Sequence, residues 1–162
     1  MPKVEPKPRT ERVRQRFESS HVIQALPARI FPLLCPVREY EWIPGWDCRL
    51  IYTESGLAEP GAIFQTDREA DDGLDTWVIS RYEPGRLISF VRVNHLRTIH
   101  YEIRLDQINE NSTKLVWSQE ITALSPAGDH HVGQLKESDF ARGIDKVGEL
   151  LRNFLGNGSS NE

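Results

Sequence analysis

The sequence is poor in the residues that build metal, redox and nucleotide sites. Only two of its 162 residues are cysteines, and only one is a methionine. Cys35 and Cys48 stand in no paired motif, which argues against a disulfide framework and fits a reducing compartment. The sequence contains no His-x-x-x-His or Cys-x-x-Cys spacing, no Gly-x-Ser-x-Gly elbow and no phosphate-binding glycine loop. We therefore predict no metal ion and no other cofactor, and neither an elbow-type hydrolase nor a nucleotide-binding protein.

The sequence also lacks long hydrophobic runs and an excess of positive charge. No apolar stretch approaches the roughly 18 residues of a membrane span, and no signal-peptide core lies near the start. The net charge of −4 gives no electrostatic reason to bind nucleic acid. With 27% charged and 38% hydrophobic residues, the composition is typical of a globular domain. We expect a cytoplasmic protein without an integral membrane segment and without a nucleic-acid partner.

The chain divides most simply into one domain with two tails. Residues 1–15 are rich in proline, lysine and arginine and have little to bury, so we expect a mobile N-terminal tail. The domain then covers residues 16–156, which is long enough for a real hydrophobic core. Residues 157–162 form a short C-terminal tail.

The domain is organised around its last helix, which we predict over residues 132–155. The apolar residues of this segment recur at steps of three and four, which places them on one stripe of a helix. They are Phe140, Ile144, Val147, Leu151, Phe154 and Leu155. Gly143 and Gly148 interrupt the helix, and glycine there often lets a neighbouring segment come close. Gly156 and Gly158 are expected to end it.

Before this helix the hydrophobic period changes to two, which predicts β-strands. A first strand (16–25) is followed by two short helical segments (28–34 and 37–46), and then by six strands joined by turns such as Asp71-Asp72-Gly73. The six strands cover residues 47–54, 62–67, 75–82, 86–93, 96–108 and 113–124. Hairpin turns make the sheet antiparallel, and one apolar face can pack on the helix. The predicted fold class is α+β, with a curved antiparallel sheet of about seven strands wrapped around the long C-terminal helix.

Five short segments, through their order and spacing, carry a resemblance to a known superfamily. They are residues 26–31 (LPARIF), 38–46 (REYEWIPGW), 76–79 (TWVI), 82–86 (YEPGR) and 122–125 (TALS). Over residues 16–156 the chain resembles START-like, SRPBCC (birch-pollen-allergen-like) helix-grip proteins, close to the polyketide-cyclase/dehydrase-like and uncharacterised bacterial branches. The resemblance implies a cavity between sheet and helix that holds an apolar or amphipathic small molecule. It implies no particular reaction, because the superfamily includes carriers, sensors, cyclases and chaperone co-factors.

Aromatic and polar residues on the apolar faces are the candidates for lining such a cavity. Tryptophan suits a pocket wall because its ring is large and its N–H needs a partner, although core packing is the alternative for each one. In an apolar setting Glu39 would have a raised pKa and could move a proton; the alternative is a solvated charge. Gln119 and Arg81 are polar residues on apolar strand faces, and each needs a ligand, a water molecule or a neighbouring strand as its partner. The cavity candidates are Glu39, Trp42, Trp46, Trp77, Phe90, Tyr101, Trp117, Gln119 and Phe140.

Three functions compete on the sequence alone. The leading hypothesis is a non-catalytic protein, monomeric or homodimeric, that binds a hydrophobic or amphipathic small molecule such as a lipid, a polyketide or an aromatic compound. This hypothesis assigns no catalytic residue. The second is an enzyme of the cyclase/dehydratase type, in which Glu39 or His100 moves a proton. The third is a protein-interaction module that resembles chaperone co-factors and uses an exposed sheet face.

Overall fold

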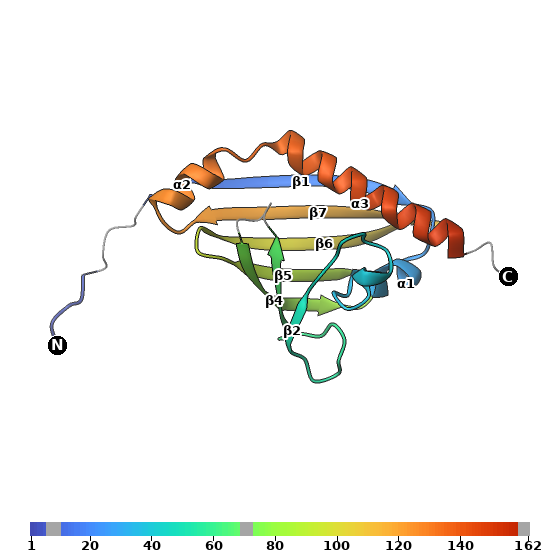
Figure 1. Ribbon diagram of the computed structural model, residues 1–162, viewed down its shortest axis with the longest axis horizontal. Coiled ribbons are helices and arrows are strands. Elements are labelled where there is room, and N and C mark those ends of the chain that lie inside the picture. Colours follow the sequence, from blue (N-terminus) through green and yellow to red (C-terminus); the bar gives the residue numbers. More distant parts are fainter. Residues whose placement is uncertain (6–10, 69–72, 159–162) are drawn as a thin grey trace.

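Seven antiparallel strands form one curved sheet in the computed structural model, which describes residues 1–5, 11–68 and 73–158 (Figure 1). The strand order is β1-β7-β6-β5-β4-β3-β2, so β1 and β2 are the two edges of the sheet. The strands are β1 (Arg14–Ile23), β2 (Arg49–Tyr52), β3 (Ile63–Arg68), β4 (Gly73–Glu83), β5 (Leu87–Val93), β6 (Arg97–Asn109) and β7 (Ser112–Ala123). The α+β fold class predicted from the sequence is confirmed.

The helices occur in two groups along the chain, one between β1 and β2 and one after β7. After β1 come α1 (Pro27–Ile30), η1 (Phe31–Leu34) and η2 (Glu39–Glu41); after β7 come α2 (Pro126–Gly133) and α3 (Glu137–Gly158). Proline suits the first turn of α1 because its missing N–H would have no partner there. The described helices include none with the length and hydropathy needed to cross a membrane.

The C-terminal helix differs from its prediction, because the expected helix over 132–155 is split into α2 and α3. The Ser125 hydroxyl caps the start of α2 by accepting a hydrogen bond from the Gly128 N–H at 3.0 Å. At the break, the Gln15 side-chain amide of β1 donates to the carbonyls of Val132 and Leu135, at 2.6 and 3.1 Å. These bonds satisfy backbone carbonyls that a continuous helix would have used. At its other end α3 continues three residues beyond the predicted end at residue 155 and stops at Gly158, one of the two glycines expected to end it.

The N-terminal part of the chain joins the fold earlier than residue 16. Asp129 of α2 receives a hydrogen bond from the Val13 N–H at 2.9 Å and pairs with the Arg12 guanidinium at 2.8 Å. The Val13 carbonyl accepts the Ala123 N–H at 3.0 Å. Residues 12 and 13 therefore fasten the start of β1 to α2 and to the end of β7.

Gly85, between β4 and β5, has φ of 76°, a conformation that glycine adopts without steric cost. Asp71 and Asp72 of the predicted turn before β4 lie outside the described residues, as do residues 6–10 of the N-terminal tail and 159–162 of the C-terminal tail.

Helix α3 lies along the edge strand β1 and covers that side of the sheet (Figure 1). Its most buried residues, Ile144, Gly148, Leu151 and Leu155, recur at steps of three and four. Gly148 sits directly on the imidazole of His21 in β1, and a Cβ at this position would overlap that ring. Beyond Gly148, the Arg152 guanidinium donates to the Val22 carbonyl at 3.0 Å. The helix can approach β1 this closely only because residue 148 has no side chain.

The two glycines inside α3 therefore predict opposite effects of the same substitution. Gly148→Ala should destabilise the protein by about 1–3 kcal/mol, as overpacked core positions do. Gly143→Ala should stabilise it by roughly 0.4–1 kcal/mol, because Gly143 is exposed and an added Cβ there meets open space. Urea unfolding of both variants measures the difference. Equal effects of the same sign would show that α3 does not rest on His21 through Gly148.

Candidate functional site

The apolar side chains of the sheet gather on the concave face, below α3. Cross-strand partners share a face, so the register between strands identifies which residues lie together. Gln119, Tyr101 and Phe90 are direct partners across β7, β6 and β5. Phe64 and Trp77 are partners across β3 and β4. His100, which alternates with Tyr101, is exposed and belongs to the opposite face, away from these aromatic side chains.

Four predicted cavity residues form a continuous aromatic wall on this face. The ring centroids lie 5.5 Å apart for Trp77 and Phe90, 6.1 Å for Phe90 and Tyr101, and 6.2 Å for Tyr101 and Trp117. The interplanar angles of 87°, 73° and 89° show that neighbouring rings meet edge to face. This geometry is attractive between aromatic rings and fixes their orientation. Phe90 and Trp117 are buried, whereas Trp77 and Tyr101 are only partly buried.

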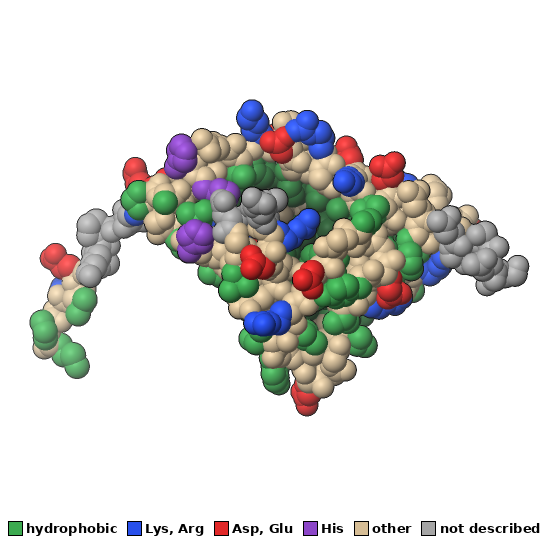
Figure 2. Space-filling view, in the orientation of Figure 1, with side chains coloured by type: hydrophobic (Ala, Val, Ile, Leu, Met, Phe, Trp, Pro, Cys, Tyr) green, Lys and Arg blue, Asp and Glu red, His purple; other side chains and the backbone are tan. Residues whose placement is uncertain are grey.

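Helix α3 adds an apolar flank to this wall. Four partly buried residues form this flank: Phe140, Val147, Leu150 and Phe154. Because each residue turns the helix by about 100°, all four lie on the same side of the stripe that packs on β1. The other side of the stripe carries Arg152, which is exposed. The apolar flank is therefore turned over the sheet. Figure 2 shows a hollow beneath α3 that is lined by hydrophobic side chains.

The two tryptophans between the short helices and β2 occupy different environments. Trp42 is buried in the core, and its indole N–H donates to the Leu33 carbonyl at 2.8 Å. Trp46 is partly exposed, and its indole N–H donates to the Pro36 carbonyl at 2.9 Å. Both bonds fasten residues 42–46 to the segment around η1. Whether either ring contacts a ligand stays a prediction.

A buried ionic cluster lies at one end of the concave face, and the sequence reading missed it. The Asp75 carboxylate accepts hydrogen bonds from Arg92 Nε at 2.8 Å and from Arg97 at 2.8 and 2.9 Å. Burial alone would raise the pKa of Asp75, but the two guanidinium groups outweigh it and hold that pKa below its ordinary value. The Arg92 guanidinium also lies 3.8 Å from the centre of the Trp77 ring. The cluster thus fixes Trp77 at the edge of the aromatic wall.

Gln119 and Glu39 are the polar candidates for the hollow. Gln119 is partly buried on the concave face, between Phe17 of β1 and Tyr101 of β6. Glu39 lies in η2 and is partly buried. Burial raises the pKa of its carboxyl to about 8, and the opposing charge of Arg68 reduces this effect. Glu39 therefore carries a proton at neutral pH and can donate a hydrogen bond.

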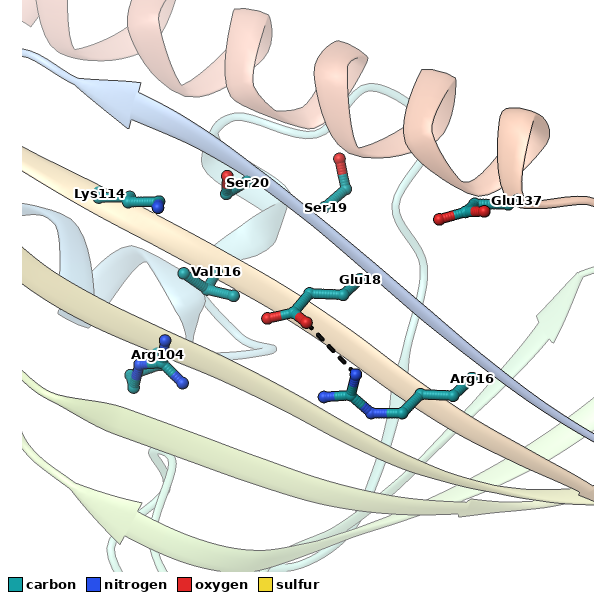
Figure 3. Close-up of a pocket in the computed structure, with 8 residues that line it drawn as sticks. All are labelled: Arg16, Glu18, Ser19, Ser20, Arg104, Lys114, Val116 and Glu137. Atoms are coloured by element: carbon teal, nitrogen blue, oxygen red, sulfur yellow. Dashed lines mark hydrogen bonds and ion pairs between the residues drawn. The ribbon is translucent and has the colours of Figure 1, made fainter.

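Two other grooves lie on the surface, and neither is lined by a residue of the aromatic wall. A polar groove of about 430 Å³ runs over β1, β7 and β6, but its charges are partly paired, as for Arg16 and Glu18 at 3.3 Å (Figure 3). A more apolar groove of about 720 Å³ lies between α1 and the turn after β4, with Phe31 and Tyr82 in its wall. Neither contains a residue predicted from the sequence to bind a ligand.

The raised pKa of Glu39 predicts a specific pH dependence of stability. The folded protein holds a proton on Glu39 between pH 4.5, the ordinary pKa, and about 8, whereas the unfolded chain releases it. Stability should therefore fall as pH rises through this window, by at most about 1.4 kcal/mol per pH unit and by less where water reaches the carboxyl.

Urea unfolding between pH 5 and 8 measures this fall. Glu39→Gln should remove it. Glu41→Gln is the matched control, because Glu41 is exposed in the same helical turn and its hydrogen bond with Arg38 lowers its pKa. If the wild type and the Glu39→Gln variant show the same pH dependence, the Glu39 carboxyl is ionised in the folded protein and is not in an apolar environment.

This chain is similar to known proteins in structure but not detectably in sequence. No family model and no curated sequence matches this chain. Among solved structures, norcoclaurine synthase from Thalictrum flavum is similar with a TM-score of 0.64 and 13% identity, covering 93% of this chain and 96% of that one. Ara h 8.0201 gives a TM-score of 0.63 at 14% identity, over 92% and 100% of the two chains. DynU16, from the dynemicin biosynthetic locus, gives 0.60 at 14% identity and covers 88% of this chain and 48% of that one. The predicted resemblance to SRPBCC (birch-pollen-allergen-like) proteins is confirmed in the fold, and this chain has their helix-grip architecture.

Proposed function

We propose that the protein binds a hydrophobic or amphipathic small molecule in the hollow between α3 and the concave face of the sheet. The observation that carries the proposal is the set of partly buried apolar side chains on both sides of this hollow. Trp77 and Tyr101 come from the sheet, and Val147, Leu150 and Phe154 come from α3. Sites for small molecules are typically concave, largely apolar and supplied with a few polar groups.

The polar groups proposed for this site suit an amphipathic molecule. The Gln119 amide offers both a donor and an acceptor on the apolar wall. The protonated Glu39 carboxyl, assigned by the proposal to the mouth of the hollow, adds a donor. Norcoclaurine synthase, which shares the fold, was solved with dopamine and hydroxybenzaldehyde. Because the two sequences are only 13% identical, this supports an aromatic ligand by analogy of fold and no further.

A second function, catalysis of the cyclase/dehydratase type, has one specific observation in its favour. The pKa of Glu39, raised to about 8, lies close to neutral pH, where a carboxyl is most effective as a general acid or base. Turnover of a polyketide-like substrate would then show a pH–rate profile that Glu39→Gln abolishes. A binding protein without catalysis would keep its ligand affinity in that variant to within a few fold.

The binding function predicts that an apolar compound stabilises the folded protein. The panel consists of fatty acids, flavonoids and the uncharged dye N-phenyl-1-naphthylamine. A ligand that binds only the native state at a hundredfold excess over Kd adds about 2.7 kcal/mol. At least one compound should therefore raise the melting temperature and quench tryptophan emission.

A matched pair of variants locates the binding site. Val147→Trp places a large ring on the apolar flank of α3 and should abolish the ligand-induced stabilisation. Lys146→Trp adds the same ring on an exposed position of the same helix and should leave it intact. Near-ultraviolet circular dichroism confirms that both variants are folded. The proposal fails if no compound changes the melting temperature, or if both variants bind it as the wild type does.

A further inference from the structure

His21 is a buried histidine held between the sheet and α3. It points from β1 toward the helix, where its ring meets Gly148, and it is 8% exposed. On the sheet side, its Nε2 lies 3.1 Å from the indole nitrogen of Trp117. Its Nδ1 has no hydrogen-bond partner among the described residues. A titratable group in this position joins the two layers that enclose the hollow.

The bond to Trp117 fixes the protonation state of His21. An indole nitrogen can only donate, so Nε2 must accept and cannot carry a proton. The neutral ring therefore holds its proton on Nδ1, which faces the backbone of α3 near the Ile144 carbonyl. Protonation would place a second N–H against the indole N–H and leave a charge in a buried site. Both changes oppose the packing of α3 on β1.

The charged groups around His21 favour its neutral form. From α3, Arg152 opposes protonation and Asp145 favours it. From the sheet, its neighbours Leu115 and Trp117 on β7 and Ile23 on β1 carry no charge. Burial is the largest effect and lowers the pKa of His21 below its ordinary value of 6.5, and Arg152 lowers it further; the Ile144 carbonyl and Asp145 oppose this without cancelling it. The folded protein thus resists a proton that the unfolded chain accepts.

The aromatic wall connects His21 to the proposed ligand site. Trp117 contacts the His21 ring at a centroid distance of 5.8 Å and the Tyr101 ring at 6.2 Å. Tyr101 in turn lies 6.1 Å from Trp77. A change at His21 therefore acts both on the helix above the hollow and on the wall beside it.

We propose that His21 is a pH-sensitive latch: when it takes up a proton it can no longer accept the Trp117 N–H, α3 loosens from β1, and a ligand in the hollow is held less tightly. The last step rests on the binding function proposed above; the loosening of α3 does not. Acid conditions would then promote ligand release, and neutral conditions would favour retention.

The sign of the pH effect follows from linkage. Because the folded-state pKa lies below 6.5, the unfolded or loosened state binds more protons as pH falls below that value. Stability from His21 is complete above about pH 6.5 and is lost on acidification. One proton changes the unfolding equilibrium constant by up to about tenfold per pH unit in this window.

The experiment compares urea unfolding from pH 8 to 5 in the wild type and in His21→Gln. Glutamine can accept the Trp117 N–H but does not titrate, so below pH 6.5 the unfolding equilibrium constant of the wild type should rise relative to that of this variant by up to about tenfold per pH unit. The opposite pH effect of Glu39 is present in both proteins and cancels in this comparison. His100→Gln, an exposed strand histidine, is the control and should follow the wild type. Arg152→Gln removes the neighbouring positive charge and brings the folded-state pKa of His21 closer to 6.5, so the acid-dependent loss should become smaller. Identical pH curves for the wild type and His21→Gln would overturn the latch.

The same proteins are then titrated with N-phenyl-1-naphthylamine at pH 8 and at pH 5.5. The Kd of the wild type and of His100→Gln should rise at the lower pH, and that of His21→Gln should rise less. An equal rise in all three would overturn the coupling to the ligand site. If neither the dye nor any other compound of the panel binds at pH 8, the proposed function fails, while the urea curves still decide whether His21 controls α3.

Discussion

The contact of Gly148 with His21 is the constraint on which the arrangement of the layers depends. It sets the distance between α3 and β1, since any side chain at position 148 would have to displace the imidazole. Ile144, Leu151 and Leu155 are buried on the same stripe only while the helix stays this close. The Arg152 bond to the Val22 carbonyl fixes the helix at the same edge strand. A small residue and a buried histidine thus determine where the longest helix rests.

Resting α3 on the sheet edge has a consequence for the rest of the concave face. A helix is only about 10 Å wide and cannot cover a seven-stranded sheet. Some apolar surface on both layers is therefore left partly exposed, as seen for Trp77, Tyr101 and the flank of α3. On a sheet without a ligand-binding role this would be unfavourable, because contiguous exposed apolar surface promotes association. The binding proposal explains this exposed surface as the place where the ligand packs. The ionic cluster of Asp75 holds Trp77, the outermost tryptophan of the wall, in place through Arg92.

The sequence predicts the strands well because their signals are local. Alternation and turn residues place β3 to β7 within two residues of their observed ends. The prediction that Arg81 lies on the apolar face of its strand is wrong. A bulge between Ile79 and Arg81 shifts the alternation, so Tyr82 follows Ile79 on the concave face and Arg81 is exposed. An extra residue in a strand leaves no clear mark on hydrophobic periodicity.

The features that sequence reading missed depend on partners far apart in the chain. The break between α2 and α3 involves Gln15 of β1, and the buried cluster joins Asp75 to Arg92 and Arg97 on two other strands. The only available signal was polar residues at apolar positions: Arg92 comes two residues after Phe90, and Arg97 two before Ile99. The same argument that singled out Gln119 could have found them. The importance of His21 could not be predicted, because it requires knowing that Gly148 lies against it.

The central claim is that a small molecule binds against the concave aromatic wall. Fluorine NMR of protein labelled with 5-fluorotryptophan tests it most directly, because each of the four tryptophans gives its own signal. On titration with N-phenyl-1-naphthylamine, we expect the Trp77 signal to shift, since this ring is partly exposed on the wall. The Trp42 signal should stay in place, because that ring is buried against η1 and bonded to the Leu33 carbonyl. Binding that leaves Trp77 unchanged, or no binding at all, would contradict the account.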